Sequence, residues 1–128
     1  MRAVDTNVLV RIFERDDPVL TAQAENVFSG DEDIFIANIV LCELAWVLRS
    51  VYRRPPDRLA TILQRLMEVD RIHLDREAAH AGLAMLAAGA DFSDGVVLHE
   101  AARARCRDVA TFDRRFARAG APEVVLIS

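Results

Sequence analysis

Four carboxylates stand at positions where they could form a metal-binding site. Asp5 directly follows the first apolar segment, and Asp113 directly follows the apolar segment 108–112. Asp94 opens a helical segment that leads into 108–112, and Glu43 lies inside the most apolar stretch of the chain. Carboxylates that converge raise one another's pKa unless positive charge lies among them. A hard divalent cation with oxygen ligands relieves that repulsion, so these residues indicate an acidic metal site suited to phosphoryl chemistry.

The charge composition excludes several other kinds of site. All 16 basic residues are arginine, and the chain contains no lysine. This excludes a P-loop lysine, Schiff-base chemistry and the lysine of a haloacid-dehalogenase phosphatase. Arginine remains available for phosphate contacts through its planar fork of donors. The net charge of -4 argues against a protein that coats nucleic acid by charge alone, and it leaves open an enzyme with a metal-filled acidic pocket.

The elements that must position these acids alternate short apolar strands with helices. The hydrophobic pattern predicts strands at 2–4, 33–37, 71–74, 108–112 and 123–127 and helices at 6–15, 19–28, 39–52, 56–69, 76–88, 94–105 and 113–117. This alternation predicts an α/β fold with a mainly parallel central sheet flanked by helices on both faces. Ligands bind beyond the carboxyl ends of such strands, where Asp5 and Asp113 are expected and Asp94 should lie close by.

Each acid also has a purely structural interpretation. Asp5 could cap the first helix, Asp113 could begin the short helix after it, and Asp94 could be a first-turn acid favoured by the helix dipole, with Ser93 as N-cap. Glu43 could face solvent at a helix edge. A buried unpaired charge there would cost several kcal/mol and would need a partner. The interpretation as a site depends on all four acids occurring together.

Four sequence blocks resemble those of PIN-domain nucleases, and in particular of the VapC-type toxins of bacterial toxin–antitoxin pairs. The blocks are M-R-A-V-D-T-N-V-L-V at the start, C-E-L in the apolar helix, A-D-F-S-D-G-V-V-L-H-E-A-A, and A-T-F-D-R-R-F. Their order and spacing extend from residue 2 to about residue 116. The resemblance implies a PIN-like fold in which residues 1–128 form a single nuclease domain.

The resemblance also implies roles for individual residues. Asp5, Glu43, Asp94 and Asp113 match the family's catalytic acids, here called the acidic quartet, which would bind Mg²⁺ or Mn²⁺. Asp94 is preferred to Asp91 because the apolar helix follows it directly. Three residues match accessory positions: Asn7 would orient the first acid, Asp91 would lie at the rim, and Thr111 would supply a hydroxyl before the last acid. Thr111 also suits a strand simply as a β-branched residue.

The activity implied by the resemblance is hydrolysis of RNA by a metal-activated water. The implied partners are a second copy of the chain, forming a homodimer, and a VapB-like antitoxin that inhibits the nuclease. Val40, Trp46 and Val47 form a second apolar stripe on the Glu43 helix, and together with the helix at 56–69 this stripe could form a groove for an antitoxin segment, although Trp46 could equally be core.

Two other functions remain open at this stage. One is a PIN nuclease that acts in RNA processing or on DNA outside any toxin–antitoxin system. The other is a non-catalytic module that binds metal or a partner. No signal peptide or membrane span is expected from the apolar segments, so a cytoplasmic location is predicted.

Overall fold

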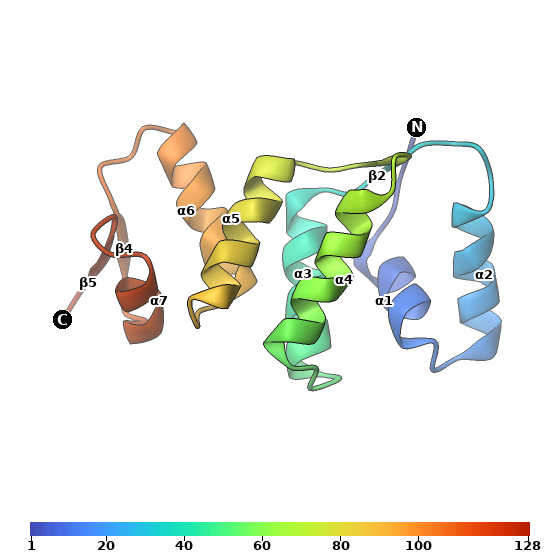
Figure 1. The fold of residues 1–128 in the computed structure, drawn as a ribbon, viewed down its shortest axis with the longest axis horizontal. Coiled ribbons are helices and arrows are strands. Elements are labelled where there is room, and N and C mark those ends of the chain that lie inside the picture. The colour runs from blue at the N-terminus through green and yellow to red at the C-terminus, as the bar shows by residue number, and fades with distance from the viewer. The chain divides into compact units, whose positions relative to one another are not determined.

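A computed structural model describes all 128 residues of the chain. The residues divide into two compact units, Met1–Asp75 and Arg76–Ser128. Both units combine helices with parallel strands (Figure 1).

The first unit combines four helices with a small parallel sheet. Its elements are β1 (Arg2–Ala3), α1 (Thr6–Glu14), α2 (Pro18–Phe28), β2 (Ile34–Phe35), α3 (Asn38–Ser50), α4 (Pro56–Glu68) and β3 (Ile72–His73). The strands lie in the order β1-β2-β3, and both pairings are parallel, with Ile34 opposite Arg2 on one side and Ile72 on the other. Because the strands are parallel, their carboxyl ends lie at the same edge of the sheet. Asp5 follows the end of β1 at that edge.

Local sequence signals start the helices of this unit. Asp17 accepts a hydrogen bond from the Leu20 N–H at 3.0 Å and caps α2, and Pro18 occupies its first turn, where a missing N–H costs nothing. Pro56 begins α4 in the same way. The buried side chains of α4 recur at three- and four-residue spacing, at Leu59, Ile62, Leu63, Leu66 and Met67. Each such side chain stabilises the unit by roughly 1.5–3 kcal/mol when fully buried.

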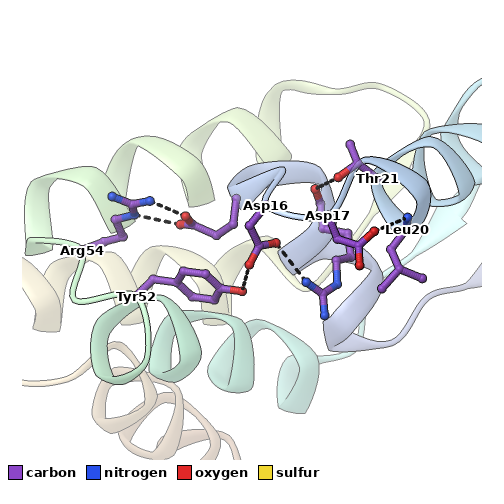
Figure 2. Close-up of polar contacts among 8 residues, drawn as sticks. Asp16, Asp17, Leu20, Thr21, Tyr52 and Arg54 are labelled. Atoms are coloured by element: carbon purple, nitrogen blue, oxygen red, sulfur yellow. Dashed lines mark hydrogen bonds and ion pairs between the residues drawn. The ribbon is translucent and has the colours of Figure 1, made fainter.

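A polar cluster joins the turn after α1 to the turn after α3 (Figure 2). Arg54 forms a two-pronged ion pair with Glu14, whose side chain is only 3% exposed. The Tyr52 hydroxyl donates to Asp16 Oδ2 at 2.9 Å, and this hydrogen bond is the main reason that the pKa of Asp16 is lowered. The cluster therefore fixes the end of α1 against the loop between α3 and α4.

The second unit combines a helical pair with a two-stranded sheet. Its elements are α5 (Arg76–Ala87), α6 (Phe92–Arg103), β4 (Val109–Thr111), α7 (Arg114–Ala119) and β5 (Val124–Leu126). Strands β4 and β5 pair in parallel, with Val109 opposite Val124. A small core of this unit contains Met85, Ala90, Phe116 and Ala117 together with Val124 of β5.

Two glycines allow α5 and α6 to approach closely. A Cβ on Gly95 would lie 2.2 Å from the backbone oxygen of Ala81, and a Cβ on Gly82 would lie 2.4 Å from the ring of Phe92. Phe92 is 2% exposed, so its ring has no room to move aside. The glycine that follows Asp94 is therefore required by packing, although it lowers intrinsic helix propensity.

The predicted α/β class and its parallel strands are confirmed, and every helix boundary lies within two residues of its expected position. The expected cap of α6 was wrong, because Asp91 and not Ser93 is its N-cap residue. Phe92 and Ser93 already form its first turn, which allows Asp94 at the third helical position to bond back to the cap. No helix is both long enough and apolar enough to cross a membrane.

Candidate functional site

Asp5 lies where β1 ends and α1 begins. It is the N-cap of α1, and its Oδ1 accepts a hydrogen bond from the Thr6 N–H at 2.7 Å. The residue is exposed. The capping interpretation is therefore correct, and it leaves oxygen lone pairs free for a cation.

Thr6 connects Asp5 to Glu43. Its side chain is buried, and its Oγ1 donates to Glu43 Oε1 at 3.3 Å, while its backbone N–H binds Asp5. Glu43 is itself exposed on α3, which agrees with the structural interpretation that it faces solvent at a helix edge. Sequence reasoning missed Thr6, although the middle position of D-T-N was the available signal. One residue thus holds two acids of the quartet in the first unit.

Asp94 lies in the first turn of α6 and is half-buried. Its Oδ2 accepts a hydrogen bond from the Asp91 N–H at 3.2 Å. Burial is the largest cause that raises the pKa of Asp94, and the negative charges of Asp91 and Asp113 raise that pKa further. The hydrogen bond from Asp91 and the charge of Arg115 act in the opposite direction. The negative charges of Asp91 and Asp113 thus act together with burial against the ionised form of Asp94.

Asp113 lies two residues after the end of β4 and caps α7. Its Oδ1 accepts hydrogen bonds from the backbone N–H groups of Arg115, at 2.9 Å, and Phe116, at 3.2 Å. The Thr111 hydroxyl oxygen accepts the Asp113 N–H at 3.0 Å. Thr111 therefore fixes the backbone of Asp113, which is compatible with the accessory position that the resemblance gave it.

The quartet is divided equally between the units, with Asp5 and Glu43 in the first and Asp94 and Asp113 in the second. Within either unit, no group of three or more histidine, cysteine, aspartate or glutamate residues is arranged to hold a metal ion. A single site made by all four acids therefore stays a prediction. The same holds for an orienting role of Asn7, since no hydrogen bond joins its side chain to Asp5.

The residue types present nevertheless fit Mg²⁺ or Mn²⁺. Both ions prefer carboxylate oxygens, and Mg²⁺ in particular is commonly held by one or two of them together with waters. Burial and neighbouring negative charge penalise ionised Asp94, as its raised pKa shows. A cation beside Asp94 would remove that penalty, whereas a neutral ligand would not.

The apolar stripe expected on α3 needs correction. Val40 is 8% exposed and Val47 is half-buried, so these two residues belong to the packed side of the helix. Trp46 is 64% exposed and shares its face with Ile39, which is 66% exposed, and with Glu43. A helix turns by about 100° per residue, which separates Trp46 from Val40 and Val47. The exposed apolar groups of α3 thus flank Glu43 and do not form the stripe that was predicted.

The family model for the PIN domain matches residues 2–122. This span includes all four acids and Asn7, Asp91 and Thr111. No curated protein matches the chain.

Proposed function

Because the chain belongs to the PIN-domain family, which implies a nuclease-type function, we propose that it is a metal-dependent endoribonuclease. The observation that carries this proposal is the presence of Asp5, Glu43, Asp94 and Asp113, each in its own motif block, within the matched span. In this proposal the four acids act as one site on RNA phosphodiesters.

The contacts within each unit support distinct roles for the acids. Asp5 and Glu43 are held by Thr6, and Asp113 is held by two N–H groups of α7. Such fixed carboxylates can hold Mg²⁺ or Mn²⁺ with little reorganisation. When bound, the ion supplies a Lewis acid that activates water and stabilises charge on the phosphodiester. Burial and neighbouring negative charge raise the pKa of Asp94, so the ion would stabilise the ionised form of this acid.

The test is cleavage of a mixed single-stranded RNA pool by the purified chain, with and without Mg²⁺ or Mn²⁺. Asp5→Asn and Asp94→Asn are compared with wild type, and Asp70→Asn serves as the control because Asp70 is an exposed acid outside the four motif blocks. We expect metal-dependent cutting that falls by at least about a hundredfold in the first two variants and is unchanged in the control.

Each other outcome has a definite meaning. Equal cutting by wild type and both site variants would identify a contaminant or a misplaced site. Cutting of a parallel DNA pool, with RNA left intact, would replace the ribonuclease by a DNA-directed nuclease. No cutting of either pool by the folded protein would favour a non-catalytic module.

We further propose that the chain is the toxin of a toxin–antitoxin pair, acts in the cytoplasm as a homodimer and is inhibited by a VapB-like antitoxin. The support is the similarity of the four blocks to VapC-type toxins and the exposed Trp46 and Ile39 beside Glu43, where a partner could cover an acid. Expression of the chain alone should arrest growth, and co-expression with a small neighbouring gene product should restore it. Growth arrest by Asp5→Asn as strong as by wild type would contradict the toxin proposal.

A further inference from the structure

A cavity of about 320 Å³ opens between α1 and α2 in the first unit. Its lining includes three polar side chains, from Asn7, Arg11 and Gln23, and three apolar ones, from Val8, Leu20 and Val27. Its volume lies at the lower end of the range for small-molecule sites, which is roughly 300–1,000 Å³. Neither the acids nor the exposed face of α3 belongs to this cavity.

Hydrogen bonds hold the walls of the cavity in place (Figure 2). The Thr21 hydroxyl donates to the Arg11 carbonyl oxygen at 3.3 Å and joins α2 to α1, and Asp17 caps α2 at Leu20. The Arg11 guanidinium donates to Asp16 Oδ1 at 2.9 Å. Tyr52 holds the other oxygen of the same carboxylate. The position of Arg11 is therefore fixed by a chain of contacts that reaches the loop after α3.

The cavity begins at the end of α1 that carries Asp5. Asn7 is two residues after Asp5, which corresponds to about 3 Å along the helix axis. Asn7 also lies about 200° around the helix from Asp5, so a strand of nucleic acid whose phosphodiester lies at Asp5 would pass around the first turn of α1 to reach it, and the base at Asn7 would belong to a nucleotide a few positions from the cut. This step depends on the proposed ribonuclease function.

We propose that this cavity binds one unstacked nucleobase of the RNA substrate and thereby sets sequence preference near the cut. The amides of Asn7 and Gln23 each carry both a donor and an acceptor, which is the combination that base edges require. Val8, Leu20 and Val27 supply apolar contact for the faces of a planar ring. The charge of Arg11 is already paired with that of Asp16, so the cavity favours a neutral ring over a phosphate group of the RNA.

Gln23 is the residue on which this proposal can be tested without disturbing the acids. It is exposed at the cavity mouth on α2, so Gln23→Leu removes the amide and leaves an apolar side chain one bond shorter. Asn26→Leu is the matched control, because Asn26 is an exposed amide on the same helix outside the cavity.

The first experiment measures binding directly and does not need activity. The side-chain amide signals of Gln23 and Asn7 are followed by NMR while AMP, CMP, GMP, UMP or ribose 5-phosphate is added to the full chain. We expect at least one nucleotide to shift the Gln23 signal, and ribose 5-phosphate to leave it unchanged. Equal shifts with ribose 5-phosphate would show a phosphate site and overturn the proposal. The absence of any shift with all four nucleotides would also overturn the proposal. A peptide segment would then be the alternative occupant of the cavity.

The second experiment reads the bases around the cut in a random-sequence RNA pool. Gln23→Leu should change the preference at one position by at least about fivefold, the effect of losing one base-edge contact, while Asn26→Leu should leave it unchanged. Metal-dependent cutting with an unaltered preference in Gln23→Leu would reject the base pocket and retain the nuclease. Nucleotide binding at Gln23 without any cutting by wild type would reject the nuclease itself.

Discussion

At the scale of single residues, Asp94 combines two opposing demands. Its carboxylate accepts the Asp91 N–H and so helps to cap α6, yet burial and the charges of Asp91 and Asp113 disfavour its ionised form. A residue selected only for capping would be placed where its charge is solvated. The raised pKa of Asp94 is therefore a cost to stability that a bound cation would offset.

Asp94→Asn should make the metal-free protein more stable at neutral pH. The asparagine keeps an oxygen for the Asp91 N–H and loses the penalised charge. Below the ordinary aspartate pKa of 3.8, the wild-type carboxyl is neutral in both folded and unfolded chains. As pH rises through the raised pKa of Asp94, wild type loses stability that the variant keeps. The difference in Tm between variant and wild type should thus grow between about pH 3 and pH 7.

Thermal melts across this pH range, without metal, measure the difference, and Asp70→Asn shows how much any surface aspartate contributes. A variant that melts below wild type at neutral pH would show that the charge of Asp94 stabilises the fold.

Thr6→Val should weaken metal binding while leaving the fold intact. Valine fills the same volume, but no hydroxyl reaches Glu43, so one acid loses its positioning contact. We expect a loss of about 10–100-fold in metal affinity or activity, as for other residues that orient metal ligands. The free energy of unfolding should fall by only about 0.5–1.5 kcal/mol.

The cleavage rate measured at increasing metal concentration separates a loss of metal affinity from a loss of activity. Thr6→Ser should restore much of the lost function because it returns the hydroxyl. If Thr6→Ser were as impaired as Thr6→Val, the buried methyl group and not the hydrogen bond would be the cause.

The sequence indicated the four acids better than it indicated their surroundings. Asp5, Glu43 and Asp113 are visible as charged residues at the end of an apolar segment or inside one, and Asp94 is visible as an acid near a helix start, although the structure starts that helix two residues earlier than expected. The contact between Thr6 and Glu43 joins residues 37 positions apart, and no local pattern predicts it. The influence of Arg115 on Asp94 likewise depends on how α7 packs, which sequence spacing does not define.

At the scale of elements, the close contact of α5 and α6 depends on Gly95. Gly95→Ala should improve helix propensity by up to about 1 kcal/mol, yet its Cβ would meet the Ala81 carbonyl oxygen at 2.2 Å. Because backbone cannot rotate away as a side chain can, we expect a net loss of about 1–3 kcal/mol in the free energy of unfolding. Urea denaturation measures the loss. Gly30→Ala is the control, because nothing lies within 4 Å of its added Cβ; equal stability of the two variants would contradict the close contact.

Helix boundaries were more predictable than strand lengths. Pro18 and Pro56 mark helix starts that local chemistry alone determines. The expected strand at 33–37 is paired only over Ile34–Phe35, because the length of a ladder depends on a partner strand far away in sequence. The orientation of Trp46 was equally unpredictable, since α3 is apolar on several sides and only packing decides which side is buried.

At the scale of the whole molecule, the PIN family match runs through both units, while each unit contains only two acids of the proposed quartet. A metal site that needs all four acids would make the stability of the units depend jointly on the cation. This dependence distinguishes one shared site from two separate weak ones.

Mg²⁺ or Mn²⁺ should therefore raise the Tm of wild type and of neither Asp5→Asn nor Asp94→Asn. A cation at a hundred times its Kd stabilises a folded protein by about 2.7 kcal/mol, which corresponds to a Tm increase of roughly 5–15 °C. If the acids form a single site, each of these two substitutions alone already removes binding. The variant that combines Asp5→Asn with Asp94→Asn then loses no more of this Tm increase than either single variant. Two independent sites would instead leave about half of the increase in each single variant and none in the double. Differential scanning fluorimetry with and without cation separates these cases, and Asp70→Asn should keep the full increase.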